Sequence, residues 1–342
     1  MHPTRTDLTR RKLLIAGASA AGTLIAMPSL AWGQAQFKMK CANIMPGDHP
    51  LNVRLTEASA KIKQETNGQI DLSIFPSSQL GTDGDMLSQV RAGAIDLFVQ
   101  SGLILGALVP VAAINGIGFA FEDYSKVWQA MDGPLGKNIQ AAFAKANLVA
   151  FDKMWDNGFR QALSTTKPIR TPEDFKSFKI RVPPSPLWTS LFKALGAAPI
   201  SIAWAETYTA LQTKMADGIE NALATIYFSK MYEISKQLSY TNHMWDGFWT
   251  VANRKSLEAL PASSRDTLVR VINEAAMKQR VDVEKLNGEL ASSLEAKGVQ
   301  FTTVDRAPFQ EKLRQAGFYS DWKRRMGDEA WSLLEASTGK LA

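Results

Sequence analysis

An alternation of extended and helical segments constrains the fold of this chain more than any other feature. Residues 69–76 (QIDLSIFP) carry an apolar side chain at every second position, whereas residues 51–68 carry them at helical spacing before a glycine. The same succession continues in residues 85–93 (DMLSQVRAG) and 94–102 (AIDLFVQSG). Strands that alternate with helices at this spacing predict an α/β protein with parallel strand pairs.

The middle of the chain repeats this plan with different residues. The junctions QVRAGAIDLF (89–98) and QTKMADGIENA (212–222) each end a helix at a glycine-containing turn and resume at an isoleucine beside an acid. Two such halves predict two lobes built on one plan. Residues 261–298 form a helical pattern that only Gly288 interrupts, and we expect this long helix to span or bend between the lobes.

The N-terminal residues 1–33 have the features of an export signal. They contain TRRKLLI (9–15), a weakly apolar run and the small residues of a cleavage site at Ala31 and Gly33, which together resemble a twin-arginine signal. The run is too short and too weakly apolar for a membrane anchor. We therefore expect a periplasmic protein, exported by the twin-arginine route and without a direct membrane anchor.

Charge and cysteine content exclude two classes of protein. Residues 1–33 carry four basic side chains and one acidic one, so the formal charge of +6 falls to +3 without them. This charge is too small to indicate a nucleic-acid-binding protein. The single cysteine, Cys41, rules out an internal disulfide framework, and we expect it to be a small buried hydrophobic residue in the first strand.

Motifs for metal, nucleotide or hydrolytic chemistry are missing from the sequence. The three histidines, His2, His49 and His243, do not lie at metal-ligand spacing, and no phosphate-binding loop or G-x-S-x-G motif occurs. We therefore expect no cofactor, no metal and no catalysis. A periplasmic enzyme on the same scaffold remains an alternative, for which His49 and Asp83 are the candidate acid and base.

Two arginines occur where an anion would explain them. Arg181 interrupts the apolar run FKIRVPPSP (178–186), and a strand interior is a costly place for a guanidinium group unless an anion meets it. Arg160 lies in WDNGFRQ (155–161). We expect both at points where a strand gives way to a loop, which is where open α/β sheets bind ligands. Each would suit a ligand carboxylate, whose geometry matches the guanidinium fork, or a structural ion pair.

Residues 178–221 resemble the signature of DctP-type substrate-binding proteins of TRAP (tripartite ATP-independent periplasmic) transporters. The motifs K-x-R-V-P, A-L-G-A-x-P, E-x-Y-x-A-L-Q and D-G-x-E-N follow one another in order, and FPSSQLGTDGDMLSQVRAGAIDL (75–97) and NGFRQ (157–161) match earlier in the chain. The resemblance covers essentially the whole chain after residue 33. It implies a periplasmic-binding-protein-like fold of two α/β lobes joined by hinge segments and a long helix.

The lobe boundaries follow from this resemblance. We expect lobe I to comprise residues 34–157 and about 247–286, and lobe II to comprise residues 158–246 and about 287–342. The resemblance implies a receptor, not an enzyme, that binds a small organic acid and delivers it to the membrane subunits of the transporter. A ligand-responsive partner of a sensor kinase would fit the same sequence.

The resemblance also implies which residues bind the ligand. Arg181 occupies the place of the arginine that clamps the ligand carboxylate, Arg160 that of a supporting arginine, and Asn221 that of an asparagine that bonds the same group. Trp204 lies where the family has an aromatic or apolar wall.

Further ligand-binding residues are expected in the first lobe and among the aromatic residues. Asn43, Asp83 and Ser101 match first-lobe positions that face the ligand in sialic-acid-binding members, and Ser101 and Pro184 depart from the more polar residues of those members. Trp155, Tyr227 and Trp245 are further candidates. Two or three aromatic walls would favour an aromatic or branched 2-oxo or 2-hydroxy acid, with a sugar acid (uronate or aldonate) as the alternative. The sequence leaves open the ligand's identity, the oligomeric state and a co-bound ion.

Overall fold

The computed structural model describes residues 35–342, so the expected export signal at residues 1–33 lies outside the described residues. No helix within residues 35–342 is both long enough and apolar enough to cross a membrane. The described chain forms one compact unit around a single mixed sheet.

The N-terminal elements form one end of this sheet and the helices beside it. Their order confirms the predicted succession of strand, helix and strand. They are β1 (Phe37–Ala42), α1 (Pro50–Glu65), β2 (Ile70–Phe75), α2 (Asp83–Ala92), β3 (Leu97–Ser101), α3 (Gly102–Leu105), η1 (Pro110–Gly116), α4 (Tyr124–Met131), α5 (Pro134–Lys145) and β4 (Leu148–Ala150).

The remaining elements form the other end of the sheet and the C-terminal helices. They are β5 (Trp155–Ser164), η2 (Pro172–Phe175), β6 (Lys179–Val182), α6 (Pro186–Ala194), β7 (Ala198–Ser201), η3 (Trp204–Glu206), α7 (Thr207–Gln212), β8 (Gly218–Asn221), α8 (Leu223–Phe228), η4 (Met231–Glu233), β9 (Gln237–Asn253), α9 (Arg254–Glu258), α10 (Ala262–Glu295), β10 (Gln300–Thr303), α11 (Ala307–Gln315), α12 (Phe318–Met326) and α13 (Asp328–Thr338).

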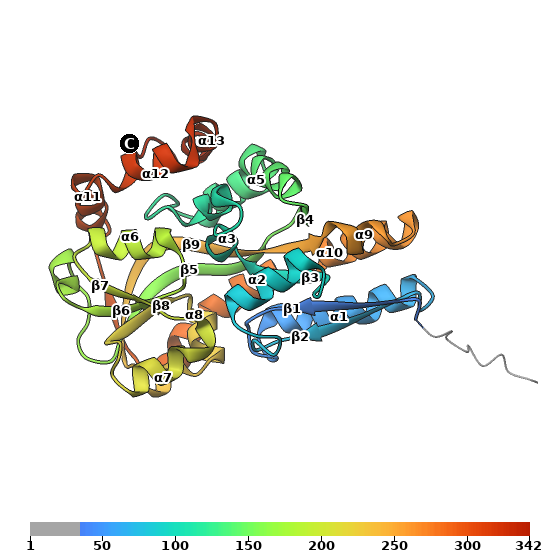
Figure 1. The fold of residues 1–342 in the computed structure, drawn as a ribbon. Helices are drawn as coiled ribbons and strands as arrows, with labels where there is room; N and C mark the ends of the chain where they lie inside the picture. The colour runs from blue at the N-terminus through green and yellow to red at the C-terminus, as the bar shows by residue number, and fades with distance from the viewer. Residues whose placement is uncertain (1–34) are drawn as a thin grey trace, which may run out of the picture. The chain divides into compact units, whose positions relative to one another are not determined.

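Two long strands join the two ends of the sheet. The strand order is β2-β1-β3-β9-β5-β8-β6-β7, and β4 and β10 also pair with β9. The predicted parallel pairs are confirmed at the ends, in β1–β2, β1–β3, β6–β7 and β6–β8. The pairs that β9 makes with β3 and β5 are antiparallel. In the strand order, β9 and β5 lie between the two ends, and Figure 1 shows them running through the middle of the molecule.

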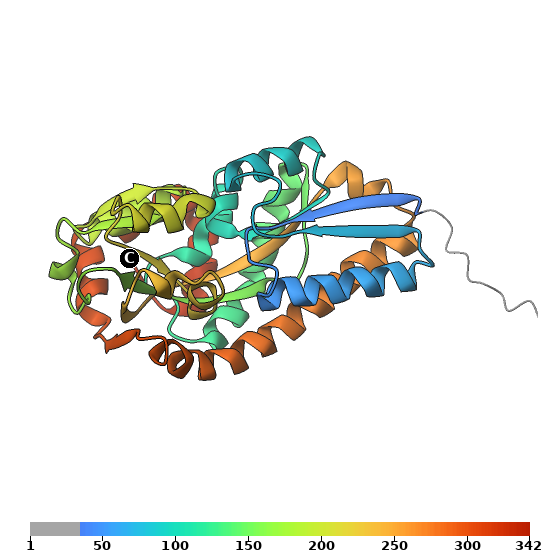
Figure 2. The ribbon, with the colours of Figure 1, turned by 90° about the horizontal axis from the view of Figure 1, so that it is seen from below.

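The predicted long helix and the buried cysteine are both confirmed. Helix α10 runs from Ala262 to Glu295 and continues through Gly288 without a break. Figure 2 shows it along one side of the molecule, beside α1, and it also contacts β5 and α8. Cys41 is fully buried in β1, where burial raises the pKa of its thiol to about 12, as expected for a small hydrophobic residue in a core.

A glycine shifts the register of β5 in the centre of the sheet. Gly158 has a φ of +115°, in the region that side chains with a Cβ rarely adopt, and it pairs with Asp246 of β9. The pairing of β5 with β9 shifts between Asp156 and Gly158 and again between Arg160 and Ala162. Such irregularities re-aim side chains near functional sites. Asn157, which precedes Gly158, and Arg160, two residues after it, both line the cavity described next.

Candidate ligand-binding cavity

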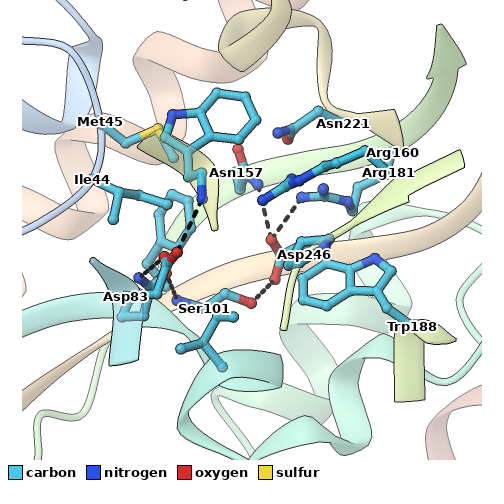
Figure 3. A pocket seen from close by; sticks show the side chains of 15 residues that line it. Ile44, Met45, Asp83, Ser101, Asn157, Arg160, Arg181, Trp188, Asn221 and Asp246 are labelled. Atoms are coloured by element: carbon cyan, nitrogen blue, oxygen red, sulfur yellow. Dashed lines mark hydrogen bonds and ion pairs between the residues drawn. The ribbon is translucent and has the colours of Figure 1, made fainter. Parts of the chain in front are cut away.

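A small cavity lies where the two ends of the sheet meet (Figure 3). The centres of water-sized molecules can occupy about 20 Å³ of it, which is room for one or two waters. Its opposing walls are therefore close together. The lining residues are Ile44, Met45, Asp83, Gln100, Ser101, Ile104, Asn157, Arg160, Arg181, Pro183, Trp188, Trp204, Asn221, Asp246 and Phe248.

Arg181 brings a buried guanidinium group with an unused donor to this cavity. It lies on β6 and is 1% exposed, and its Nε and Nη2 donate hydrogen bonds of 2.9 and 2.6 Å to the carbonyl oxygen of Ile202. Its buried Nη1 has no hydrogen-bond partner among residues 35–342, and no carboxylate there lies within salt-bridge distance. Burial lowers the pKa of Arg181 to about 10, although the charges of Asp83 and Glu220 oppose this.

Arg160, in contrast, already has two carboxylate partners. Its Nη2 donates to Glu220 Oε1 at 2.7 Å and its Nη1 to Asp246 Oδ2 at 3.0 Å. Arg160 lies inside strand β5, so the expectation that it would stand at a strand-to-loop boundary was wrong. Arg181 lies one residue before the end of β6, as expected.

The pKa values of the two partners of Arg160 are shifted in opposite directions. Burial alone would raise the pKa of Glu220, but the charge and hydrogen bonds of Arg160 and a hydrogen bond with His243 hold it at about 2. Burial raises the pKa of Asp246, and Arg160 only partly offsets this. His243 Nε2 lies 3.0 Å from Glu220 Oε2, and burial lowers the pKa of this imidazole.

Each arginine also stacks on a tryptophan that lines the cavity. The guanidinium carbon of Arg160 lies 4.8 Å from the ring centre of Trp188, and that of Arg181 lies 5.3 Å from the ring centre of Trp204. Contacts of this kind between a cation and an aromatic face are attractive. Figure 3 shows the two arginines next to each other with Asp246 and Trp188 beside them.

Two carboxylates face the arginines from the remaining walls. Asp83, at the start of α2, accepts hydrogen bonds from Gln100 Nε2 at 2.9 Å and from the backbone N–H of Trp204 at 3.1 Å. The second bond joins α2 to η3, which lie at different ends of the sheet. Asp246 accepts hydrogen bonds from Ser101 Oγ at 2.6 Å and from Asn157 Nδ2 at 2.9 Å.

The structure brings six of the ten sequence-predicted site residues into the lining and leaves four outside it. The six are Arg181, Arg160, Asn221, Trp204, Asp83 and Ser101, and the four are Asn43, Trp155, Tyr227 and Trp245.

Three of the four residues outside the lining have partners elsewhere. Asn43 Oδ1 accepts a hydrogen bond from the N–H of Met45, which helps to shape the loop that carries Ile44 and Met45 to the cavity. Trp155 Nε1 donates to Thr250 Oγ1 at 2.8 Å and Trp245 Nε1 to Asp156 Oδ1 at 2.9 Å, so both indoles are bonded within the core.

Sequence reasoning did not single out the polar lining residues Asp246 and Asn157. Asp246, Asn157, Trp188 and Phe248 line the cavity, and Glu220 supports it from behind Arg160. The sequence does contain a signal for Asp246, which is a charged residue inside a long apolar strand. The same kind of signal marks Arg181. In the segment HMWDGFWT (243–250), Asp246 is the acidic residue among apolar and aromatic neighbours.

The described residues offer neither a metal site nor the acid–base pair considered from sequence. Within residues 35–342, no group of three or more histidine, cysteine, aspartate or glutamate side chains is arranged to hold a metal ion. His49 caps helix α1, where its Nδ1 accepts a hydrogen bond from the N–H of Leu51, and burial lowers its pKa to about 3. It does not line the cavity with Asp83.

A cavity between two linked α/β halves, lined by apolar walls and a few polar groups, is a common place for a small-molecule site. Residues 41–319 match the DctP family, described as bacterial extracellular solute-binding protein, family 7. The chain therefore belongs to the DctP family of TRAP periplasmic solute-binding proteins, which are binding proteins and not enzymes.

Curated relatives of this chain carry the names of acid-binding proteins. The chain is 31% identical over 253 residues to the 2,3-diketo-L-gulonate-binding periplasmic protein YiaO of Escherichia coli, a match that covers 74% of this chain and 77% of that protein. It is 27% identical over 339 residues to the C4-dicarboxylate-binding periplasmic protein DctP of Rhodobacter capsulatus, covering 97% and 100%. It spans 56% of the length of a Sinorhizobium fredii relative with which it is 29% identical.

Solved structures share the fold. A TRAP periplasmic solute-binding protein of Ralstonia eutropha H16, with bound (S)-2-hydroxy-2-methyl-3-oxobutanoate, superimposes with a TM-score of 0.84 at 26% identity. The match covers 88% of this chain and 98% of that one. This match confirms the predicted two-lobed fold with a long helix, whereas the lobe boundaries given above stay a prediction.

Proposed function

We propose that this protein is a receptor for a small organic carboxylate, which it binds in the cavity and delivers to TRAP membrane subunits. Residues from both ends of the sheet line the cavity, so a ligand there would contact both. Its preference for the closed arrangement would shift the equilibrium of the hinge. The family of the chain supports the general role, and the arrangement of Arg181 supports the ligand class.

The observation that carries this proposal is the unpartnered Nη1 of Arg181. A fully buried guanidinium group with an unused donor lacks the anion that would normally accompany it. A ligand carboxylate would supply both the missing acceptor and the opposite charge. Asn221 lines the same cavity and would add an amide donor.

The walls favour a ligand with a compact, partly apolar body. Trp188, Trp204 and Phe248 line the cavity together with aliphatic side chains, and these surfaces suit a branched or aromatic 2-oxo or 2-hydroxy acid. The Ralstonia eutropha protein named above holds a branched 2-hydroxy acid. Ser101, Asn157 and Gln100 offer polar partners as well, and these favour a sugar acid as the second candidate.

Thermal unfolding of the mature protein against a library of organic acids tests the proposal, because a ligand that binds only the folded state raises its melting temperature. We expect shifts with acids of one chemical class in the wild type and none in Arg181→Ala, since losing a buried carboxylate contact costs about 2–5 kcal/mol of binding free energy. Arg181→Lys keeps the charge but loses the fork and should bind weakly.

Arg170→Ala is the matched control, because Arg170 is exposed and does not line the cavity. It should bind as the wild type does. Wild-type affinity in Arg181→Ala would contradict the proposed clamp. Binding of neutral sugars or peptides with no response to acids would contradict the receptor for carboxylates.

A further inference from the structure

The residues that line the cavity carry equal numbers of basic and acidic groups, and one more acid behind them leaves an excess of acidic groups before any ligand is considered. Two basic residues, Arg160 and Arg181, and two acidic residues, Asp83 and Asp246, line it. Glu220 adds a third carboxylate behind Arg160. One ligand carboxylate would raise the number of negative groups to four, against two guanidinium groups.

Only one of the two guanidinium groups has room for a ligand anion. Arg160 donates to Glu220 through Nε and Nη2 and to Asp246 through Nη1. Arg181 has the unpartnered Nη1. A first carboxylate would therefore bind at Arg181, and a second one would find no unpaired cation among the residues that line the cavity.

Asp246 is fixed so that it presents a carboxylate at the cavity wall. It is 1% exposed, it lies opposite Gly158 in the centre of the sheet, and Ser101, Asn157 and Arg160 all donate to it. Three donors on one side chain hold its position. Asp83 is likewise held by Gln100 and by the backbone of Trp204.

We infer that the cavity selects monocarboxylates that carry a hydroxyl group over dicarboxylates, and that Asp246 is the residue that imposes this selection. This inference rests on the proposed carboxylate receptor. A second ligand carboxylate would lie against Asp246 and Asp83 in a buried site, where like charges repel strongly. A ligand hydroxyl group would instead donate a hydrogen bond to a carboxylate oxygen of Asp246 or Asp83. The same two residues would therefore weaken the binding of a diacid and strengthen the binding of a hydroxy acid.

Calorimetric titration of the mature protein with matched ligands tests the inference. Butanoate, 4-hydroxybutanoate and succinate share four carbons and differ in the terminal group, and D-gluconate and D-glucarate form a six-carbon pair. In the wild type, near neutral pH, we expect the hydroxy acid of each set to bind at least about tenfold more tightly than the diacid, because juxtaposed like charges penalise the diacid. In Asp246→Asn this ratio should shrink to about threefold or less, since Asn keeps the shape and loses the charge.

Two further variants separate charge from structure. Asp266→Asn removes an exposed carboxylate that does not line the cavity, so the ratio of the two affinities should stay close to that of the wild type. Asp83→Asn removes the other carboxylate that lines the cavity and should shrink the ratio as Asp246→Asn does. It serves as the second test should Asp246→Asn fail to fold, as judged by circular dichroism.

The outcomes distinguish this inference from the proposed function. Acids that bind through Arg181 but without preference for hydroxy acids, or a ratio that neither Asp246→Asn nor Asp83→Asn changes, overturn the inference and leave the receptor standing. Failure of every acid to bind, together with the absence of any organic acid in extracts of the denatured protein, overturns the proposed function and the inference with it.

Discussion

Arg160 and Arg181 stand side by side in one cavity, and both are buried and stacked on a tryptophan, but their hydrogen-bond partners differ. Arg160 has two carboxylate partners, a neighbouring histidine bonded to one of them and a stacked tryptophan. Arg181 has one carbonyl oxygen, a stacked tryptophan and an unpartnered nitrogen. The first arginine is a completed structural ion pair, and the second is an incomplete one.

This difference teaches that burial of a charge does not by itself identify a ligand-binding residue. Both arginines fit the family motifs, and both satisfy the argument that a buried guanidinium group needs an anion. Only the count of donors that remain unused separates them. A side chain whose partners are supplied by the protein contributes to stability, and one that lacks a partner is available to a ligand.

The largest expected effect comes from removing each arginine in turn and measuring the free energy of unfolding with urea, in the absence of ligand. Arg160→Met leaves Glu220 and Asp246 buried without their cation, and breaking a buried pair in this way costs about 3–5 kcal/mol of stability. Arg181→Met removes a buried charge that has no carboxylate partner, which favours the folded state. The variant also loses the hydrogen bonds to Ile202, which disfavours it. We expect the substitution to change stability by no more than about 1 kcal/mol.

The slope of the unfolding curve serves as the control, because it reports the surface exposed on unfolding and should be equal in the two variants and the wild type. Similar losses of stability in both variants would contradict the comparison. A larger loss in Arg181→Met than in Arg160→Met would reverse the assigned roles.

How far the sequence could predict this cavity depends on the distance over which its contacts form. The α/β plan, the long helix α10, the buried Cys41 and the motif that contains Arg181 all follow from local patterns of spacing and side-chain type. The partners of Arg160 do not, because Glu220 and Asp246 lie 60 and 86 positions away on strands β8 and β9. Their meeting depends on strand register, which the bulge at Gly158 sets.

The aromatic candidates show the same limit at a smaller scale. In a strand, successive side chains point to opposite faces of the sheet. Asp246 and Phe248 share one face of β9 and line the cavity, whereas Trp245 packs against Trp128 and Phe121. The sequence marks this segment as aromatic, but it does not say which of the two alternating sets faces the ligand.

Acid titration sharpens the comparison, because Glu220 is hydrogen-bonded to Arg160 and not to Arg181. The folded pKa of Glu220 is about 2, below the usual glutamate value of 4.5, so its contribution to stability is complete above pH 4.5. This contribution is lost as the pH falls from 4.5 towards 2. We expect the free energy of unfolding of the wild type to decrease across this range more steeply than that of Glu220→Gln.

The difference between the two proteins isolates Glu220, since other buried groups such as His49 titrate in both. Urea unfolding at a series of pH values measures it. Arg181→Met should keep the steep decrease and Arg160→Met should weaken it, because Arg160 supplies the charge that lowers the pKa of Glu220. Parallel curves for the wild type and Glu220→Gln would contradict this account.

The smallest expected effect separates the two tryptophans that stack on the arginines. Replacement by Phe keeps an aromatic ring but weakens the attraction to the cation, by about 0.5–2 kcal/mol in a desolvated site. In Trp188→Phe this change should appear in the free energy of unfolding, because Arg160, 4.8 Å from that ring, serves the fold. In Trp204→Phe it should appear in the dissociation constant of the acid, because Arg181, 5.3 Å from that ring, keeps the donor for the ligand. Urea unfolding and calorimetric titration of both variants measure the two effects. Equal losses of stability and affinity in both variants would contradict the separate roles of the two arginines. The two rings would then act on one shared network, in which neither arginine serves the fold or the ligand alone.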